Sequence, residues 1–321
     1  MARYGMTIPI GGVPLNEHRD WYREMVDLGY TDLWSSEAGG QDGFTPLALA
    51  AAWAPEARLG VAIIPAFTRG PATLAMSVAS LAEAAPGRFV MGIGASSNVI
   101  VERWNGIPFE NPYARVRDTV KFMRTALAGE KVEEDYESFS VKGFRLQMNP
   151  LAVQPKILVA ALREGMLRLA GRLGDGAILN WLSADDVKTV APLVHAGGEG
   201  KEIVARIFVC PTTDVEKARA IGRRMIAAYL TVPVYAAYHE WLGRGERLEG
   251  LWTHWKSGDR KAALEAIPDE VVDELVIHGS PDECREHVAR YVDAGVDTPA
   301  LAIVHADDMR TAVRELAPRG G

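Results

Sequence analysis

Small and hydroxyl-bearing residues gather in one short segment that could hold a flat ring or a phosphate. The segment reads Gly92-Ile93-Gly94-Ala95-Ser96-Ser97-Asn98. Its glycines let a backbone approach a ligand closely, and its side chains supply hydrogen-bond donors. The dinucleotide-binding pattern GxGxxG is not met, because Ser97 stands where the third glycine would be. Glycines here are equally consistent with tight packing alone, so the pattern leaves both interpretations open.

A second candidate segment, Val159-Ala160-Ala161-Leu162-Arg163-Glu164-Gly165-Met166, leads directly into an expected helix. The first amides of a helix lack intrahelical partners, and the helix dipole favours an anion beside them. We therefore predict a phosphate site on these amides. Arg163 could add charge, although a solvated position in the first helical turn is the simpler interpretation of this residue.

Acid–base chemistry has two candidates, Ser36 and Glu37, which follow an expected strand and precede a glycine-rich loop. A carboxylate in such a place could transfer a proton to or from a substrate. A loop acid without a catalytic role is the alternative. Thr68 and Arg69 follow the next expected strand, and Arg69 has the same ambiguity, because it could simply pair with a neighbouring carboxylate.

The elements that must position these residues alternate between short apolar runs and segments of helical periodicity. Eight strands separated by helices predict a parallel sheet, and eight such units favour a closed (β/α)₈ barrel, a TIM barrel, over an open sheet. In such barrels the active site lies at the C-terminal ends of the strands, which is where all these candidates fall. The expected strands are Tyr4–Ile8, Thr31–Ser35, Leu59–Ile64, Phe89–Ile93, Ile157–Ala160, Ala177–Asn180, Ile203–Cys210 and Ala300–Val304.

Two insertions interrupt the repeat. Alternating residues between Gly129 and Pro155 predict a β-hairpin after strand four, and residues 230–278 form a helical stretch rich in Trp and Tyr between strands seven and eight. No Pro/Ser-rich linker divides the chain, so we expect one domain over residues 1–321.

Composition limits the class of partner. The 321 residues carry a net charge of −7 without a run of like charge, which argues against a nucleic-acid or anionic-lipid partner. No segment approaches the roughly 20 apolar residues of a membrane span. The two cysteines lie far apart, so a reducing cytoplasm is expected. The histidines lack metal-ligand spacing, and no metal site is expected.

Several segments together resemble the luciferase-like superfamily. They are Leu59–Ala72, Gly87–Gly94, Leu169–Gly176 with the preceding Val159–Ala161, and the helix Pro281–Gly295. The resemblance spans nearly the whole chain. Within the superfamily it is strongest to the branch that uses the deazaflavin coenzyme F420, which includes methylenetetrahydromethanopterin reductases.

The resemblance implies a (β/α)₈ barrel, a cofactor ring at the barrel mouth and a homodimer. It also implies a non-proline cis peptide in strand three, which falls at Ala62–Ile63, and it places Thr68 among the cofactor contacts. Gly94, Ala95, Ser96 and Ser97 would edge the ring, and Ala160, Ala161, Leu162 and Arg163 would face its phosphate. Relatives that oxidise glucose 6-phosphate carry an Asp-His pair after strand two, where this chain has Ser36 and Glu37. That difference argues against a sugar-phosphate substrate.

The resulting hypothesis is an enzyme that transfers a hydride between coenzyme F420 and a small organic substrate, with Glu37 and Ser36 as catalytic residues. The alternatives are an FMN-dependent monooxygenase of the same fold and a non-redox barrel enzyme acting on a phosphorylated metabolite. The absence of a lysine at a strand end argues against a Schiff-base aldolase within that last class.

Overall fold

Eight parallel strands close into a barrel in the structure, a computed structural model that describes residues 3–318. Around the barrel the order is β12–β1–β2–β3–β5–β8–β9–β10, and β10 pairs with β12 to complete the ring. This confirms the predicted (β/α)₈ barrel. The strands are β1 Gly5–Thr7, β2 Asp32–Ser35, β3 Arg58–Val61, β5 Phe89–Gly94, β8 Lys156–Ala160, β9 Gly176–Asn180, β10 Glu202–Cys210 and β12 Thr298–Ile303.

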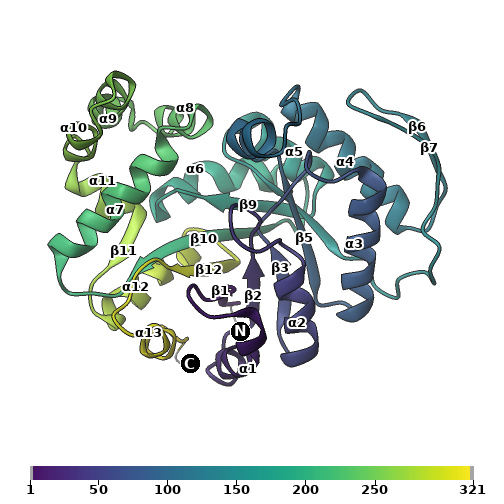
Figure 1. Ribbon diagram of the computed structural model, residues 1–321, viewed down its shortest axis with the longest axis horizontal. Coiled ribbons are helices and arrows are strands. Elements are labelled where there is room, and N and C mark those ends of the chain that lie inside the picture. The colour runs from purple at the N-terminus through teal and green to yellow at the C-terminus, as the bar shows by residue number, and fades with distance from the viewer. Residues whose placement is uncertain (1–2, 319–321) are drawn as a thin grey trace.

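Helices surround the barrel and bury one face each against it (Figure 1). Four of them, α2, α3, α4 and α12, have proline in the first turn, where the missing amide hydrogen has no helical partner to lose. The surrounding helices are α1 Arg19–Asp27, α2 Thr45–Trp53, α3 Pro71–Ala84, α4 Pro112–Leu127, α5 Glu164–Leu173, α6 Ala184–His195, α7 Val215–Leu230, α12 Pro281–Asp293 and α13 Met309–Glu315. A short 3₁₀ turn, Leu15–Glu17, precedes α1.

Both insertions lie where the sequence predicted them, on opposite sides of the barrel in Figure 1. The first is an antiparallel hairpin of β6 Val132–Asp135 and β7 Ser140–Phe144, which packs Phe144 against Phe122 of α4 with ring centroids 5.7 Å apart. The second contains α8 Pro233–Trp241, α9 Gly245–Ser257, α10 Arg260–Glu265 and α11 Asp269–Leu275.

The predicted bounds need correction at three places. The third strand is interrupted, because β3 ends at Val61 and β4, Ile64–Pro65, continues the pairing with β5. The intervening Ala62–Ile63 peptide is cis, as predicted. The second insertion ends in a strand that the sequence analysis missed, β11 Val276–His278, which pairs with the end of β10. A π-helical segment, Val99–Trp104, follows β5 where a loop was expected.

A buried ion-pair cluster fills the N-terminal end of the barrel. The first residues of β2, β3, β8 and β10 are Asp32, Arg58, Lys156 and Glu202. The guanidinium of Arg58 donates to both carboxylate oxygens of Glu202, at 2.6 and 2.7 Å, and to Asp32 at 3.2 Å. Lys156 donates to Glu202 at 2.8 Å. Burial acts to raise the pKa of Glu202, but the hydrogen bonds and charges of Arg58 and Lys156 outweigh it and hold that pKa at about 2.

A tryptophan fills the barrel interior above this cluster. Trp34 of β2 lies buried beside Arg58, whose guanidinium carbon is 5.9 Å from its ring centre. A Cβ atom at Gly60 would lie 2.3 Å from the Trp34 ring, so the glycine leaves the space that the indole occupies. The barrel is therefore closed from its N-terminal end to its middle, which leaves the C-terminal mouth for a site.

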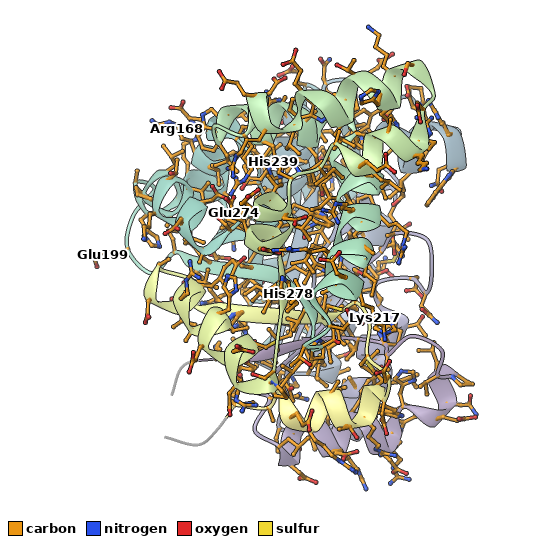
Figure 2. The ribbon with its side chains drawn as sticks, turned by 90° about the vertical axis from the view of Figure 1, so that its left-hand side faces the viewer. Arg168, Glu199, Lys217, His239, Glu274 and His278 are labelled. Atoms are coloured by element: carbon orange, nitrogen blue, oxygen red, sulfur yellow. The ribbon has the colours of Figure 1, made fainter. Side chains whose placement is uncertain are left out.

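The helical insertion is fastened to the barrel by a second buried arginine. Arg244 donates to Asp186 at 3.0 Å and to Glu274 of α11 at 2.9 Å. His239 of α8 is fully buried close by, and burial lowers its pKa to about 3, so this imidazole is neutral. Figure 2 shows this side of the molecule, where His239 and Glu274 lie among the packed helices and Glu199 lies at the outer edge.

Two further findings concern the cysteines and the length and polarity of the helices. Cys210 and Cys284 are both free and buried. Within residues 3–318, every helix is too short or too polar to cross a bilayer.

Candidate functional site

Ile63, before β4, and the last residues of β5 and β8 lie together at the barrel mouth, and we call this surface the floor. Gly94 is the central residue of this floor. A Cβ atom built on it would lie 2.8 Å from the Cβ of Ala160 and 3.3 Å from the side chain of Ile63. The amide of Ala66 donates to the Gly94 carbonyl at 2.8 Å and fixes the β4 end beside it. Three residues predicted to contact a cofactor, Ile63, Gly94 and Ala160, are thus brought together.

The segment after Gly94 turns sharply and begins the π-helical segment. Ser96 has a φ of 66°, in the left-handed region, and Ser97 starts the turn by accepting from the Val101 amide at 2.9 Å through its carbonyl. Ala95, Ser96 and Ser97 are all half-buried. Their hydroxyls and amides therefore form a polar edge next to the apolar floor, and the ring-edging role predicted for them stays a prediction.

The start of α5 leaves backbone amides without helical partners beside the same floor. The N-cap residue is Arg163, and its side chain makes no capping hydrogen bond. By contrast, α6 and α12 begin with complete capping boxes at Ser183 and Ser280. The first helical bond of α5 runs from the Leu167 amide to the Arg163 carbonyl, at 3.0 Å. The amides that precede Leu167 can bind an anion.

One residue must be removed from the predicted phosphate site. The Ala161 amide donates to the Ile178 carbonyl of β9 at 3.1 Å, and its side chain is buried. The barrel itself therefore uses this donor. Leu162 is half-buried and Arg163 is exposed, so the candidate anion site begins with their amides rather than with that of Ala161.

Glu37 does not stand alone at the mouth. Both of its carboxylate oxygens accept hydrogen bonds from the guanidinium of Arg69, and one of them also accepts from the Gly43 amide at 3.0 Å. Thr68 lies within 3.5 Å of the same carboxylate. This confirms the simpler interpretation of Arg69 as the partner of a carboxylate. The catalytic role of Glu37 stays a prediction, and a substrate would have to share the carboxylate with Arg69.

Ser36 and Ala62 line a narrow crevice among the barrel strands, a pocket too tight in this structure for a free water molecule. Its other lining residues come mostly from β1, β2, β9, β10 and β12: Thr7, Trp34, Ser35, Ile178, Val204, Arg206 and Ala300. Ser35 is not free to bind a ligand, because its hydroxyl donates to the Gly43 carbonyl at 2.5 Å. Ser36 is therefore the better placed of the two serines to reach a ligand.

The sequence analysis missed Arg206, the one charged residue in the lining of this pocket. It lies within the apolar run Ile203–Cys210, where strand alternation puts it on the same face as Val204 and Phe208. Val204 belongs to the barrel interior. The alternation of inward and outward residues along this strand could therefore have identified Arg206 as a cation on the inward face of the barrel.

Comparison with known proteins agrees with this arrangement. Residues 3–298 match the family described as Luciferase-like monooxygenase, and the chain belongs to that family. A protein of Mycobacterium tuberculosis that is named as a proposed coenzyme F420-dependent oxidoreductase is 27% identical over 94% of each chain. The 5,10-methylenetetrahydromethanopterin reductase of Archaeoglobus fulgidus is 28% identical over 84% of each chain.

The fold also matches a solved structure. The coenzyme F420-dependent tetrahydromethanopterin reductase of Methanopyrus kandleri superposes with a TM-score of 0.80, covering 98% of this chain and 97% of the other at 18% identity. At this identity the match supports the fold alone.

Proposed function

We propose that the protein is an oxidoreductase that binds coenzyme F420 at the barrel mouth and exchanges a hydride with a small organic substrate. The observation that carries the proposal is the family membership over residues 3–298, together with a relative of similar length that is named for coenzyme F420. When bound, the deazaflavin ring supplies the hydride chemistry at its C5 carbon, and the protein supplies orientation and electrostatics.

The floor of Ile63, Gly94 and Ala160 fits the flat ring of such a cofactor. Any side chain at position 94 would occupy the space against Ala160 and Ile63, so the glycine keeps this surface low. Apolar small residues below and hydroxyls at the edge suit a planar ring with polar atoms on its rim. The amides at the start of α5 that have no helical partner suit the cofactor's phosphate. Arg163 is the N-cap residue of this helix and can add a positive charge beside them.

Protons in the proposed reaction would move through Ser36 or Glu37. Ser36 lines the pocket next to Ala62, where its hydroxyl can donate to or accept from a substrate oxygen. Glu37 is held by Arg69 and Gly43, which orients the glycine-rich loop after β2. In this proposal Ser36 contacts the substrate, and Glu37 either transfers the proton or positions the loop.

Side-by-side equilibrium titration with coenzyme F420 and FMN, followed by fluorescence, tests the proposal. We expect coenzyme F420 to bind at least roughly tenfold more tightly than FMN, a difference of about 1.4 kcal/mol. Tighter binding of FMN would instead support the monooxygenase alternative. If neither cofactor binds, the redox assignment fails and the non-redox alternative remains.

Three further properties are proposals. The homodimer is implied by the family resemblance, the single domain by the lack of a linker and the cytoplasm by the two separate cysteines. We propose that the chain, as one domain, forms a homodimer and works in the cytoplasm. Sedimentation equilibrium of the full chain checks the first point, and a mass equal to the monomer across micromolar concentrations would contradict it.

A further inference from the structure

Arg206 is half-buried and, unlike the buried Arg58 and Arg244, has no acid paired with it within the described residues. Arg58 pairs with Glu202 and Asp32, and Arg244 pairs with Asp186 and Glu274. Within residues 3–318, Arg206 makes no ion pair, and its buried Nε atom has no hydrogen-bond partner. The contact found for its guanidinium is with the ring of Phe208, 5.1 Å from its centre. The buried Nε of this half-buried guanidinium is therefore a donor that a ligand can still engage.

The pocket that Arg206 lines is otherwise neutral. Its other lining residues are Thr7, Trp34, Ser35, Ser36, Ala62, Ile178, Val204 and Ala300. No carboxylate lines this pocket and most of its walls are apolar, so a charge pair formed here is screened less than one at the surface. The electrostatics of this pocket therefore favour an anion.

Two polar side chains next to Arg206 extend the same site. Asn180 of β9 is the register partner of Arg206, and its buried Oδ1 atom has no hydrogen-bond partner within the described chain. Its Nδ2 atom donates to the hydroxyl oxygen of Tyr235 at 3.4 Å. Burial raises the pKa of Tyr235, which keeps this hydroxyl protonated. Arg206 thus offers guanidinium donors for an oxyanion, and Asn180 offers its Oδ1 as an acceptor for a ligand hydroxyl.

The position of Arg206 separates it from the proposed cofactor floor. The floor lies at the ends of β5 and β8 and at Ile63 before β4, whereas Arg206 lies on β10, which β9 separates from β8. Ala62 lines the Arg206 pocket and is covalently joined to Ile63 of the floor. A ligand held by Arg206 would therefore lie next to the ring site, where a substrate must be.

We propose that Arg206 binds the carboxylate of an organic acid, with Asn180 Oδ1 free to accept from a hydroxyl of the same ligand, and so makes this enzyme specific for an anionic substrate. That the bound acid is the substrate of the enzyme rests on the proposed function. The binding of an anion by Arg206 does not depend on the cofactor. We favour a carboxylate over a phosphate for two reasons. The Nε and one terminal nitrogen of a guanidinium match the two coplanar oxygens of a carboxylate. The pocket is also narrow, which favours a planar group over a tetrahedral one.

The test measures anion binding to the full chain without cofactor. Isothermal titration calorimetry would compare acetate, lactate and benzoate with acetamide, lactamide and benzamide, and with inorganic phosphate. We expect at least one carboxylate to bind and its amide not to bind. Arg206→Met should weaken that carboxylate roughly tenfold or more, because it loses a charge-assisted pair of hydrogen bonds, and Arg206→Lys should restore part of the loss. Arg168→Met, at an exposed position of α5 outside both proposed sites, is the matched control and should bind the carboxylate normally.

A second titration separates this proposal from the cofactor assignment. Coenzyme F420 should bind Arg206→Met within about twofold of its affinity for the wild type, and melting curves should show both variants folded. Equal carboxylate binding by the wild type and Arg206→Met, or no carboxylate binding at all, would overturn the proposal. So would binding of phosphate that is tighter than that of every carboxylate and is lost in Arg206→Met, since the amides of α5 can bind phosphate without Arg206. A tenfold loss of coenzyme F420 affinity in Arg206→Met would also overturn it and would assign Arg206 to the cofactor. If the wild type binds a carboxylate through Arg206 but not coenzyme F420, the anion site stands and the proposed function fails.

Discussion

The two carboxylate oxygens of Glu37 both accept hydrogen bonds from the guanidinium of Arg69, with the Nη2–Oε2 pair at 2.7 Å. This bidentate pair joins the loop after β2 to the loop after β4, and the Gly43 amide adds a third hydrogen bond to the same carboxylate. Two of the loops that border the site are therefore held in one arrangement by a single acid.

The pairing leads to a discriminating prediction for Glu37. If Glu37 positions the loop, Glu37→Gln and Arg69→Met should lower turnover by similar factors, below about tenfold, with an unchanged pH profile. If it transfers the proton, Glu37→Gln alone should lose roughly 10²–10⁴ in turnover and one limb of the pH profile. We expect the first result, because both oxygens are already engaged. A large loss in Glu37→Gln beside a near-normal Arg69→Met would contradict this expectation.

Filling the floor at Gly94 should weaken cofactor binding. Gly94→Ala puts a methyl group 2.8 Å from the Cβ of Ala160, and such overpacking costs about 1–3 kcal/mol. We expect roughly tenfold weaker binding of coenzyme F420 in a fluorescence titration, and recovery in the double variant Gly94→Ala/Ala160→Gly. Gly11→Ala is the control, since its Cβ would meet nothing within 4 Å. Unchanged affinity in Gly94→Ala would remove this floor from the cofactor site.

Reversing the charge at the start of α5 should weaken the binding of the cofactor's phosphate and leave the binding of its ring unchanged. Arg163→Glu puts a negative charge beside amides that we propose to bind an anion, so intact coenzyme F420 should bind several-fold more weakly. The ring-bearing core without phosphate should bind as it does to the wild type. Arg168→Glu, at an exposed position on the same helix, controls for the change in net charge. Equal losses for both ligands in Arg163→Glu would show that Arg163 is outside the phosphate site.

Acid should destabilise the barrel through Glu202. Its pKa is about 2 in the folded protein and 4.5 ordinarily, so folding favours the ionised form. The stabilisation is complete above about pH 4.5 and is lost as the pH falls from there toward 2, an effect on the order of 3 kcal/mol. Urea titrations across this range should show the loss in wild type and in the exposed-site control Glu133→Gln, but a much smaller one in Glu202→Gln.

The same variant should be unstable at neutral pH. Glu202→Gln leaves the buried Arg58 with Asp32 as its remaining carboxylate partner, and breaking a buried pair costs about 3–5 kcal/mol. Loss of less than about 1 kcal/mol in the free energy of unfolding at pH 7 would mean that Asp32 alone compensates Arg58. Glu133→Gln should stay within about 0.5 kcal/mol of the wild type.

The order of strands and helices could be predicted from the sequence, because hydrophobic periodicity depends on neighbours within a few residues. Eight apolar runs separated by amphipathic segments were enough to indicate the barrel, and the end of each strand marked Ser36, Gly94 and Ala160 as residues of its mouth. The hairpin after strand four was predicted on the same basis. These features are local, and the sequence carries them directly.

Which residues meet across the barrel was decided by the tertiary structure alone. The pairing of Glu37 with Arg69, the use of the Ala161 amide by β9 and the position of Arg206 without an acid all depend on segments far apart in the chain. Short strands such as β11 also form only because β10 offers its free edge. Hydrogen bonds and charges act over a few ångströms in space, and closing the ring of strands brings together residues that no local pattern could pair.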